Sequence, residues 1–587
     1  MIKKFYPTLA FLLFSAYTSG QTSSLTRGPY MNSATQNSII IRWNTDVPDD
    51  SKVRFGTSPD NFTNEVIDNT ITTEHIVQLS GLTGDTKYYY SIGSNDQILQ
   101  GDANNYFKTL PASGSTQKVR ILAMGDMGNN SNNQINVRDA YLNYNKNNYT
   151  DIWMLLGDNA YNNGTETEYQ TKFFNNYQDN LTKNHVLWPA PGNHEYANIS
   201  TRQADHLISY YDIFSLPKNG EAGGIASNNE AFYSYDYGNI HFVSLDSYGW
   251  ETGDSRLFDT TGPQVTWLKQ DLAANKLQWT VVYFHHPPYT KGSHNSDTET
   301  ELILLRQNLV RILERYKVDL VLNGHSHCYE RSYLINGHFD VESTFNIATH
   351  ALSSSSAKYD GSANSCPYFK NSTEVRNGVV FAVVGSAGQL GGSTPGYPHN
   401  AMRYSNISTG GSMVIEIESN RLDARWICSD GVIRDNFTIM KDVNKITDTS
   451  FSAGSSISLS ASWIGNYNWS TGEKTRSITV SPSSEISYNV HDNVDCLEDI
   501  FNVSNNRQVK TKIFPNPSRS EFSLVIESGS SEDVEIVVTN IYGSKVFLTK
   551  GKFNDTYTFG KNFLPGLYLL QVSQGENIET FKLIKAN

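Results

Sequence analysis

Alternating apolar and polar residues dominate both ends of the chain, whereas its middle contains continuous apolar runs. Residues 26–110 alternate in short stretches such as SIIIRWNT and KYYYSIGS, which are separated by turn residues. A period of two is typical of strands with one buried face, so this region predicts a small β-sandwich. Residues 111–117, PASGSTQ, have the composition of a linker.

The pattern changes at residue 118. Runs such as VRILAMGD and DIWMLLGD are apolar almost throughout, as expected for strands that are buried on both faces. Between the runs lie stretches with apolar residues every three or four positions, such as residues 301–317, and these predict helices. The alternation indicates a layered α/β domain that ends near residue 440.

Strand patterns return after this domain. Residues 450–503 predict one more small immunoglobulin-like module, and residues 510–587 predict a third β module. The expected order is β-sandwich, α/β domain and two C-terminal β modules, with boundaries at 24–112, 118–440, 448–505 and 508–587. Several modules are expected because single hydrophobic cores stop growing beyond about 250–300 residues.

The first residues carry a different signal. Lys3 and Lys4 precede an apolar stretch at 9–14, and small residues precede Gln21. This arrangement is typical of a secretory signal peptide, which we assign to residues 1–20. No later segment has eighteen consecutive apolar residues, so we expect an exported protein without a transmembrane segment.

Net charge and cysteines narrow the expectations further. The formal charge of −13 argues against a nucleic-acid scaffold as partner, but bound cations could still attract an anionic substrate. In an oxidising compartment the four cysteines allow up to two disulfides in three possible pairings. These cysteines are Cys328, Cys366, Cys428 and Cys496.

Five apolar runs of the α/β domain end in residues that can bind metals. These residues are Asp126; Asp158 and Tyr161; Asn193 and His194; His285 and His286; and His325 and His327. Ligands in open α/β sheets lie beyond the carboxyl ends of the strands, so the five ends would converge. Carboxylates suit hard cations and imidazoles suit transition metals. The set predicts a metal pair that one aspartate bridges.

A lone GD after a strand is more often a turn and a lone GNH is more often structural, while a lone GHxH fits a site and a pair of surface histidines equally well. Here all five occur together, and each closes an apolar run. A glycine precedes Asp126, Asp158, Asn193 and His325, where it lets the backbone turn sharply and brings the next side chain close. The combination therefore favours a functional site.

Five blocks carry a resemblance to a known family: GD at 125–126, GDNAY at 157–161, GNHE at 192–195, HHPPY at 285–289 and GHSHCYER at 324–331. They resemble the signature of the calcineurin-like metallophosphoesterases, and most closely the purple acid phosphatases. The β-sandwich that begins TRGPYM is similar to the fibronectin III-like N-terminal domain of plant-type members. The resemblance covers about residues 26–440 and implies a metallophosphoesterase α/β sandwich, with two sheets flanked by helices.

The resemblance also implies metals and ligands. The family holds Fe(III) at the first site and a divalent ion such as Fe, Zn or Mn at the second. The first-site ligands would be Asp126, Tyr161 and His327, the bridge Asp158, and the second-site ligands Asn193, His285 and His325. Tyr161 discriminates best, because related protein phosphatases and nucleases have other residues there. The family pattern H-x-P-x-Y makes His285 the ligand and His286 the variable position, and we expect His286 to support the site from behind the ligands or to lie at the surface.

Two further histidines acquire roles through the resemblance. His194, beside the ligand Asn193, would touch the substrate phosphate. His294 matches a substrate-pocket histidine of plant-type enzymes and is the candidate general acid, with a solvated loop histidine as the alternative. Plant-type enzymes often have a second histidine directly after it. Here that position is Asn295, which departs from the plant pattern.

Several residues near the motifs have structural interpretations. We expect Glu330 and Arg331 to form a buried pair that braces the loop after His327. Asp246 closes a strand and is expected either to support the ligands from behind or to support the structure alone. Cys328 is expected to be a disulfide partner or a buried thiol, because the metal pair already has enough ligands.

The C-terminal tail carries a second resemblance. FPNPSRSEFSLVI, IYGSKVF and LPGLYLLQV resemble the sorting domain of type IX secretion systems. By that resemblance the tail is an export signal that is cleaved or used for surface attachment, and its partner is the type IX machinery. The 448–505 module is expected to be a spacer, with a carbohydrate- or partner-binding role as the alternative.

These observations predict a secreted dimetal acid phosphatase. It would hydrolyse small phosphate monoesters by in-line attack of a metal-bound hydroxide. A phosphodiesterase or nucleotide pyrophosphatase would use the same ligands and stays an alternative. A surface binding protein with a degenerate site is a third hypothesis, against which the complete ligand set argues.

Overall fold

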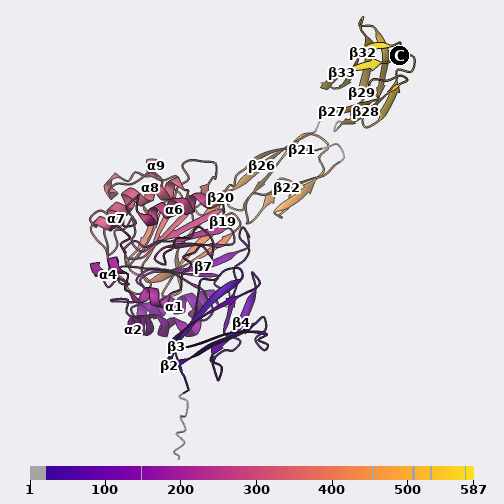
Figure 1. Ribbon diagram of the computed structural model, residues 1–587. Coiled ribbons are helices and arrows are strands. Elements are labelled where there is room, and N and C mark those ends of the chain that lie inside the picture. Colours follow the sequence, from indigo (N-terminus) through magenta and orange to yellow (C-terminus); the bar gives the residue numbers. More distant parts are fainter. Residues whose placement is uncertain (1–21, 147, 452–454, 506–508, 529–531, 576) are drawn as a thin grey trace, which may run out of the picture. The chain divides into compact units, whose positions relative to one another are not determined.

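The computed structural model describes residues 22–146, 148–451, 455–505, 509–528, 532–575 and 577–587 (Figure 1). The predicted signal peptide lies outside the described residues. The chain divides into two compact units: Met1–Ser354, Arg376–Ile417 and Ala424–Asn436 form the first, and Ser355–Val375, Glu418–Asp423 and Phe437–Asn587 form the second. Within the described residues, no helix has the length and apolar composition that crossing a membrane requires.

The first unit begins with six antiparallel strands. They are β1 Leu25–Asn32, β2 Ser38–Gly56, β3 Asn64–Ser80, β4 Lys87–Gly93, β5 Ile98–Gln100 and β6 Tyr106–Lys108. Their order is β1-β2-β4-β5, with β3 paired to β2 and β6 paired to β4. Ile39, Ile41 and Trp43 alternate with more exposed residues and are buried, as a period of two requires. The predicted strand-rich region is confirmed, although β2 and β3 are long, with 19 and 17 residues, and hydrogen bonds join all six strands into one sheet.

The α/β part of this unit contains two sheets, as predicted. One has the order β10-β11-β12-β13-β16-β14-β17: Tyr233–Tyr237, Ile240–Ser244, Trp279–Tyr283, Leu320–Asn323, Val380–Val384, Tyr329–Ser332 and Met402–Asn406. The other has the order β18-β7-β8-β9 within this unit: Gly411–Glu418, Val119–Met124, Ile152–Leu156 and Leu187–Ala190. Strands β7, β8 and β9 are parallel, as are β11, β12, β13 and β16. Their continuous burial explains their continuous apolar sequence.

Helices pack against these sheets. The longest are α1 Asn132–Asn145 and α6 Pro263–Ala274. Residues 300–315 form α7 Thr300–Leu304, η3 Leu305–Leu309 and α8 Val310–Arg315, which confirms the helical prediction for 301–317. Side chains of α6, η3 and α8 share one core with side chains of β11, β12 and β13. The three- and four-residue apolar spacing therefore reflects packing on a sheet.

Short helical segments complete the first unit. They are α2 Glu166–Glu168, η1 Tyr169–Phe174, α3 Asn175–Tyr177, η2 Gln178–Thr182, α4 Ser200–Asp205, α5 Ser209–Ile213, η4 Glu342–Thr344 and α9 Ile347–His350. Several of these segments anchor the N-terminal strands. Arg27 of β1 contacts Glu166 at 2.6 Å, and the hydroxyl of Tyr30 donates to the carbonyl of Ile213.

The second unit consists mainly of strands. β15 Tyr368–Lys370 pairs with β20 Ile433–Lys441, while β19 Arg421–Cys428 and β20 each contain residues of both units. The region predicted to be an immunoglobulin-like module contains β21 Ile446–Phe451, β22 Ile457–Ser460, β23 Asn468–Trp469, β24 Ser477–Val480, β25 Ile486–His491 and β26 Glu498–Asn505. Their orders are β21-β26-β25-β23 and β22-β24, around a core that includes Trp463 and Trp469.

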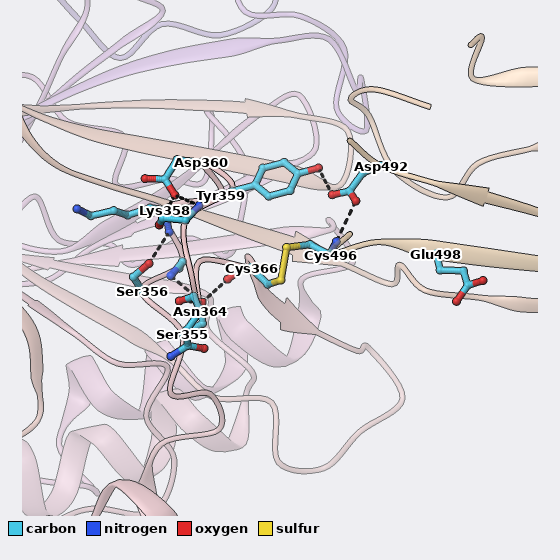
Figure 2. The surroundings of a disulfide bond; sticks show 12 residues. Ser355, Ser356, Lys358, Tyr359, Asp360, Asn364, Cys366, Asp492, Cys496 and Glu498 are labelled. Carbon is cyan, nitrogen blue, oxygen red and sulfur yellow. Dashed lines mark hydrogen bonds between the residues drawn. A yellow bond between two sulfur atoms is a disulfide. The ribbon is translucent and has the colours of Figure 1, made fainter. Parts of the chain in front are cut away.

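A disulfide joins Cys366 to Cys496 within this unit (Figure 2). Beside it, the hydroxyl of Tyr359 donates to Asp492 at 2.8 Å. Cys328 and Cys428, both in the first unit, are buried free thiols. Of the two interpretations of Cys328, the structure therefore supports the buried thiol.

The C-terminal region contains two small sheets. β27 Val509–Phe514, β28 Phe522–Ser528 and β31 Thr556–Phe559 form the first, in that order. The second has the order β30-β29-β32-β33, which are Lys545–Gly551, Val534–Asn540, Gly566–Gln574 and Asn577–Lys585. The third β module is thus confirmed as β-rich. The two compact units divide the chain differently from the expected modules, so the module boundaries stay predictions.

Candidate metal centre

The five predicted strand ends meet at one place, but they come from two sheets. Asp126, Asp158 and Asn193 follow β7, β8 and β9 of one sheet, whereas His285 and His325 follow β12 and β13 of the other. The amide of Gly125 donates to the carbonyl of Val384, which joins the two sets of strand ends. The site is therefore built between two sheets rather than on a single open one.

The first donor group consists of Asp126, Tyr161 and His327. The Tyr161 hydroxyl lies 3.0 Å from Oδ1 of Asp126 and 3.1 Å from Nε2 of His327. The same Nε2 lies 3.5 Å from Oδ1 of Asp126. Three side chains from three strand ends thus place their polar atoms at one point.

The second donor group consists of Asn193, His285 and His325. Oδ1 of Asn193 lies 3.0 Å from Nε2 of His285 and 3.1 Å from Nδ1 of His325. Asp158 adjoins both groups: its Oδ2 is 3.2 Å from Nε2 of His285, and its carboxylate raises the pKa of Tyr161. Asp126, Asp158 and His285 offer ligand atoms within 4.8 Å of one another. The seven side chains fit two neighbouring cations better than one.

Each histidine of the two groups directs one nitrogen inward, and another residue lies at its outer nitrogen. Nδ1 of His285 is 2.9 Å from the carbonyl of Leu156. Nδ1 of His327 is 3.2 Å from Nε2 of Gln389, and Nε2 of His325 is 3.8 Å from Glu299. Metal-binding histidines are commonly oriented by such outer partners. The donor chemistry and these partners together fit a metal pair.

Backbone conformation explains how the acidic groups come so close. Asp126, Asp158 and His325 have φ of 59°, 51° and 65°, in the left-handed region that non-glycine residues rarely adopt. A Cβ on Gly192 would lie 2.3 Å from Oδ1 of Asp158, and one on Gly324 would lie 2.5 Å from Oδ2 of Asp126. Gly192 and Gly324 are therefore needed because a carboxylate lies too close to leave room for a side chain. The positive φ that turns the backbone belongs to Asp126 and Asp158 themselves.

The electrostatics of these residues would change in the presence of cations. Burial raises the pKa of the Tyr161 hydroxyl well above its ordinary value, and Asp126 and Asp158 raise it further. Burial also raises the pKa of Asp158, but His285 and His194 outweigh this effect and lower it below the ordinary value. The side chains alone therefore keep Tyr161 a neutral phenol, and nearby positive charge would be needed to favour its phenolate.

The two predicted substrate residues lie beside the donor groups. Nδ1 of His194 is 2.6 Å from the carbonyl of Asn162, and its ring packs 4.5 Å from that of Tyr161. The ring of His294 stacks at 3.7 Å on that of His325, and its Nδ1 is 2.8 Å from Glu299. His294 is thus held by two neighbours while its side chain stays 33% exposed, and its role as general acid stays a prediction.

The sequence did not predict the role of three side chains at the site. Glu195 accepts hydrogen bonds from the loop that carries Asp158, while Glu299 and Gln389 contact histidines of the site. Glu195 is the last residue of the GNHE block, and its closeness to Asn193 in the sequence was the only indication that it belongs to the site. Glu299 and Gln389 lie in polar loops without any motif, and only the folded chain brings them to the histidines.

Other structural expectations are corrected in part. Glu330 and Arg331 are both buried, but they do not brace the loop as a pair. The Thr290 hydroxyl donates to Glu330, whereas Arg331 binds Asp435 at 2.6 Å. The two side chains follow one another in strand β14 and so point to opposite faces, which separates their partners.

Two more expectations have simple outcomes. His286 is buried, and its Nδ1 lies 2.9 Å from the hydroxyl of Ser247, so it supports the loop rather than lying at the surface. Asp246 accepts hydrogen bonds from the amides of Tyr248 and Gly249 and from the hydroxyl of Tyr196. Its structural interpretation is consistent with these contacts.

Comparison with known families defines the class of this fold and site. Residues 119–329 match the calcineurin-like phosphoesterase family, and residues 29–109 match the N-terminal domain of purple acid phosphatases. Residues 512–586 match the secretion system C-terminal sorting domain. The chain therefore carries a calcineurin-like phosphoesterase domain between a purple acid phosphatase N-terminal domain and a sorting domain.

Within that class the chain is similar to purple acid phosphatases. It is 30% identical over 286 residues to purple acid phosphatase 15 of Arabidopsis thaliana, covering 44% of this chain and 49% of the relative. It is 27% identical over 339 residues to phosphoenolpyruvate phosphatase of Allium cepa, covering 54% of this chain and 64% of the relative. The chain spans about half the length of the curated relatives it matches.

Solved structures agree on the fold. The purple acid phosphatase PPD1 from yellow lupin (Lupinus luteus) seeds superposes with a TM-score of 0.53 at 19% identity, covering 72% of this chain and 74% of that chain. PhoD superposes with a TM-score of 0.50 at 14% identity, covering 73% and 91% of the two chains. At such identities the likeness extends to the arrangement of elements alone.

Proposed function

We propose that the chain is a dimetal phosphatase of the purple acid phosphatase type, acting on small phosphate monoesters. One observation carries this proposal: seven mostly buried side chains form two adjacent donor groups, with Asp158 next to both. A surface binding protein has no need for such a cluster, because burying acidic groups together is costly without compensating positive charge.

The donor types suggest which ions would be held. Asp126, Tyr161 and His327 include two oxygen donors that become anionic, which suits Fe(III). Asn193, His285 and His325 offer neutral donors, which suit a divalent ion such as Fe, Zn or Mn. Bound cations of this kind neutralise phosphoryl oxygens and lower the pKa of water. The expected reaction is an in-line displacement of the leaving alkoxide at phosphorus.

The protein's own residues would bind the phosphate and supply a proton. Because Nδ1 of His194 faces the Asn162 carbonyl, its Nε2 is left for a substrate oxygen, 3.8 Å from Asp158. Because Nδ1 of His294 faces Glu299, its Nε2 is the nitrogen that could protonate the leaving oxygen. Asn193 would contribute its side chain to the same pocket.

Two measurements test the proposed function. Metal analysis of the purified chain should find two tightly bound ions, and an aryl phosphate monoester should be hydrolysed faster than the matched diester. Faster turnover of the diester would instead support a phosphodiesterase or nucleotide pyrophosphatase. Less than one tightly bound ion per chain, with no hydrolysis, would support the binding protein.

The sorting domain supports export as a further part of the proposal. We infer that the type IX machinery recognises residues 508–587 and delivers the protein to the cell surface or the medium. A chain that ends at residue 505 should then fail to cross the outer membrane, while its phosphatase activity should be intact. Equal delivery of full-length and shortened chains would contradict this role.

A further inference from the structure

Glu195 occupies the junction of two loops that carry site residues. The side chain is buried, with 1% of its surface exposed. Its two carboxylate oxygens accept five hydrogen bonds: from the amides of Asp158 (2.9 Å), Asn159 (2.8 Å), Ala160 (3.3 Å) and Gly192 (2.7 Å) and from the hydroxyl of Tyr169 (3.1 Å).

The local backbone explains why so many amides converge. Gly157 and Asp158 have φ of 90° and 51°, so the chain turns through two successive left-handed residues. Such a turn can point successive N–H groups to one side and form a concave anion-binding site. Here the anion is internal to the chain, because the carboxylate of Glu195 fills the concavity.

The same carboxylate joins two strand ends. The loop after β8 carries Asp158 and Tyr161, and the loop after β9 carries Asn193 and His194. The amide of His194 also donates to Oδ1 of Asp158 at 2.9 Å, so the loops are linked twice. A shift of either loop would move the residue that adjoins both donor groups.

We propose that Glu195 is a positioning residue that sets the relative place of Asp158 and Asn193, and thereby the affinity of the metal pair. This inference rests on the proposed function. Glu195 is not itself a ligand, since the five donors already engage both of its oxygens. This role does not require a bound metal. In the metal-free protein the carboxylate accepts hydrogen bonds from backbone amides of the folded loop, and buried amides without an acceptor would be costly.

The test compares Glu195→Gln with a matched control. An amide of the same size keeps one acceptor but turns an NH₂ group toward amides that also donate. Asp246→Asn is the control, because Asp246 is another buried carboxylate that accepts two amides and a tyrosine hydroxyl. Competition with a chromophoric chelator would measure Zn²⁺ affinity, and thermal unfolding of the metal-free proteins would measure stability.

The expected result is a Zn²⁺ affinity about 10- to 100-fold weaker for Glu195→Gln, the range typical of residues that orient metal ligands. The control should bind Zn²⁺ like the wild type, even if both variants lose similar stability. The visible absorption of the iron-loaded variant should also shift or weaken, because Tyr161 belongs to the same loop. A merely structural role would lower stability in both variants without separating their affinities.

The outcomes distinguish the two levels of the proposal. If the wild type binds no metal, the proposed function fails and the role of Glu195 fails with it. If the wild type binds two ions and Glu195→Gln binds them equally well, the positioning role alone is overturned. Should Glu195→Gln not fold, Tyr169→Phe removes one donor only: a smaller loss of affinity supports the role, and unchanged affinity overturns it.

Discussion

Tyr161 is the residue on which the proposed iron chemistry depends. Its hydroxyl lies between Asp126 and His327, and burial together with two carboxylates raises its pKa. Such a phenol would ionise only beside a strongly charged cation. The resemblance of the GDNAY block to the family signature predicted that Tyr161 lies with Asp126 and His327, and the structure brings the three side chains together.

Tyr161→Phe should therefore abolish visible absorption of the oxidised protein. The ring can stay packed against His194, so the fold should survive. An absorption spectrum of the purified variant beside the wild type is the measurement, with metal content as control. A colourless wild type that holds two zinc ions would refute the Fe(III) assignment.

His294 is the second residue whose role can be isolated. His294→Ala should lower kcat about 100-fold or more on a monoester with a poor leaving group, the range of general acid catalysis. An activated aryl phosphate needs no proton, so its kcat should change little. Glu299→Gln should also lower kcat, but by less, because it weakens the contact that holds the His294 ring in place. Unchanged kcat on the poor leaving group would exclude His294 as the acid.

At the scale of elements, the strands were predictable and their partners were not. The runs that become β7, β8, β12 and β13 are apolar because both faces are covered, so their ends could be located from sequence. The resemblance implied two sheets, but the sheet to which each strand belongs could not be predicted, because the apolar pattern of a strand does not determine its neighbour. Glu195 shows the same limit: its amide partners at 158–160 lie about 36 residues away along the chain.

One clamp between elements makes a pH-dependent prediction. His241 of β11 lies 2.7 Å from Asp236 of β10 and 2.8 Å from Asp271 of α6. Burial lowers the pKa of His241, but the two carboxylates outweigh this effect and raise it to about 9. Because the folded-state pKa exceeds the unfolded value of about 6.5, the protonated clamp stabilises fully below that value. Its contribution disappears as pH rises through about 9.

The measurement is the Tm of the wild type and of His241→Gln across this range. The difference should be several degrees near about pH 6 and should shrink toward about pH 10. His206→Gln is the control, because the ring of His206 contacts a backbone carbonyl instead of carboxylates. A Tm difference that stays constant with pH would contradict the clamp.

At the scale of the whole molecule, the two units differ in their cysteines: the second unit contains a disulfide, whereas the first contains free thiols. Sequence alone left three cysteine pairings open, since Cys366 and Cys496 stand 130 positions apart in the chain. Packing in the second unit brings them together beside the Tyr359–Asp492 hydrogen bond (Figure 2). The free thiols Cys328 and Cys428 stay buried, so neither is available for exchange with the bond.

The double variant Cys366→Ser/Cys496→Ser should lose about 2–5 kcal/mol of stability in the second unit, because the bond closes a long loop. Metal content should not change, since no donor belongs to that unit. Calorimetry would measure the unfolding transition of each unit. Cys428→Ser is the control, because it removes a free thiol and leaves the disulfide in place. Loss of metal in the double variant would contradict this independence.

The left-handed backbone at Asp158 has a practical consequence for designing an inert form of the protein. Asparagine tolerates positive φ better than other non-glycine residues, and its oxygen could keep the hydrogen bond from the amide of His194. Its NH₂ group could donate to Nε2 of His285 in place of the ionic contact. Asp158→Asn would then remove the negative charge next to both donor groups while sparing the architecture, whereas alanine would remove the charge and strain the turn as well. Asparagine is thus the substitution with which to trap an uncleaved ester for crystallography.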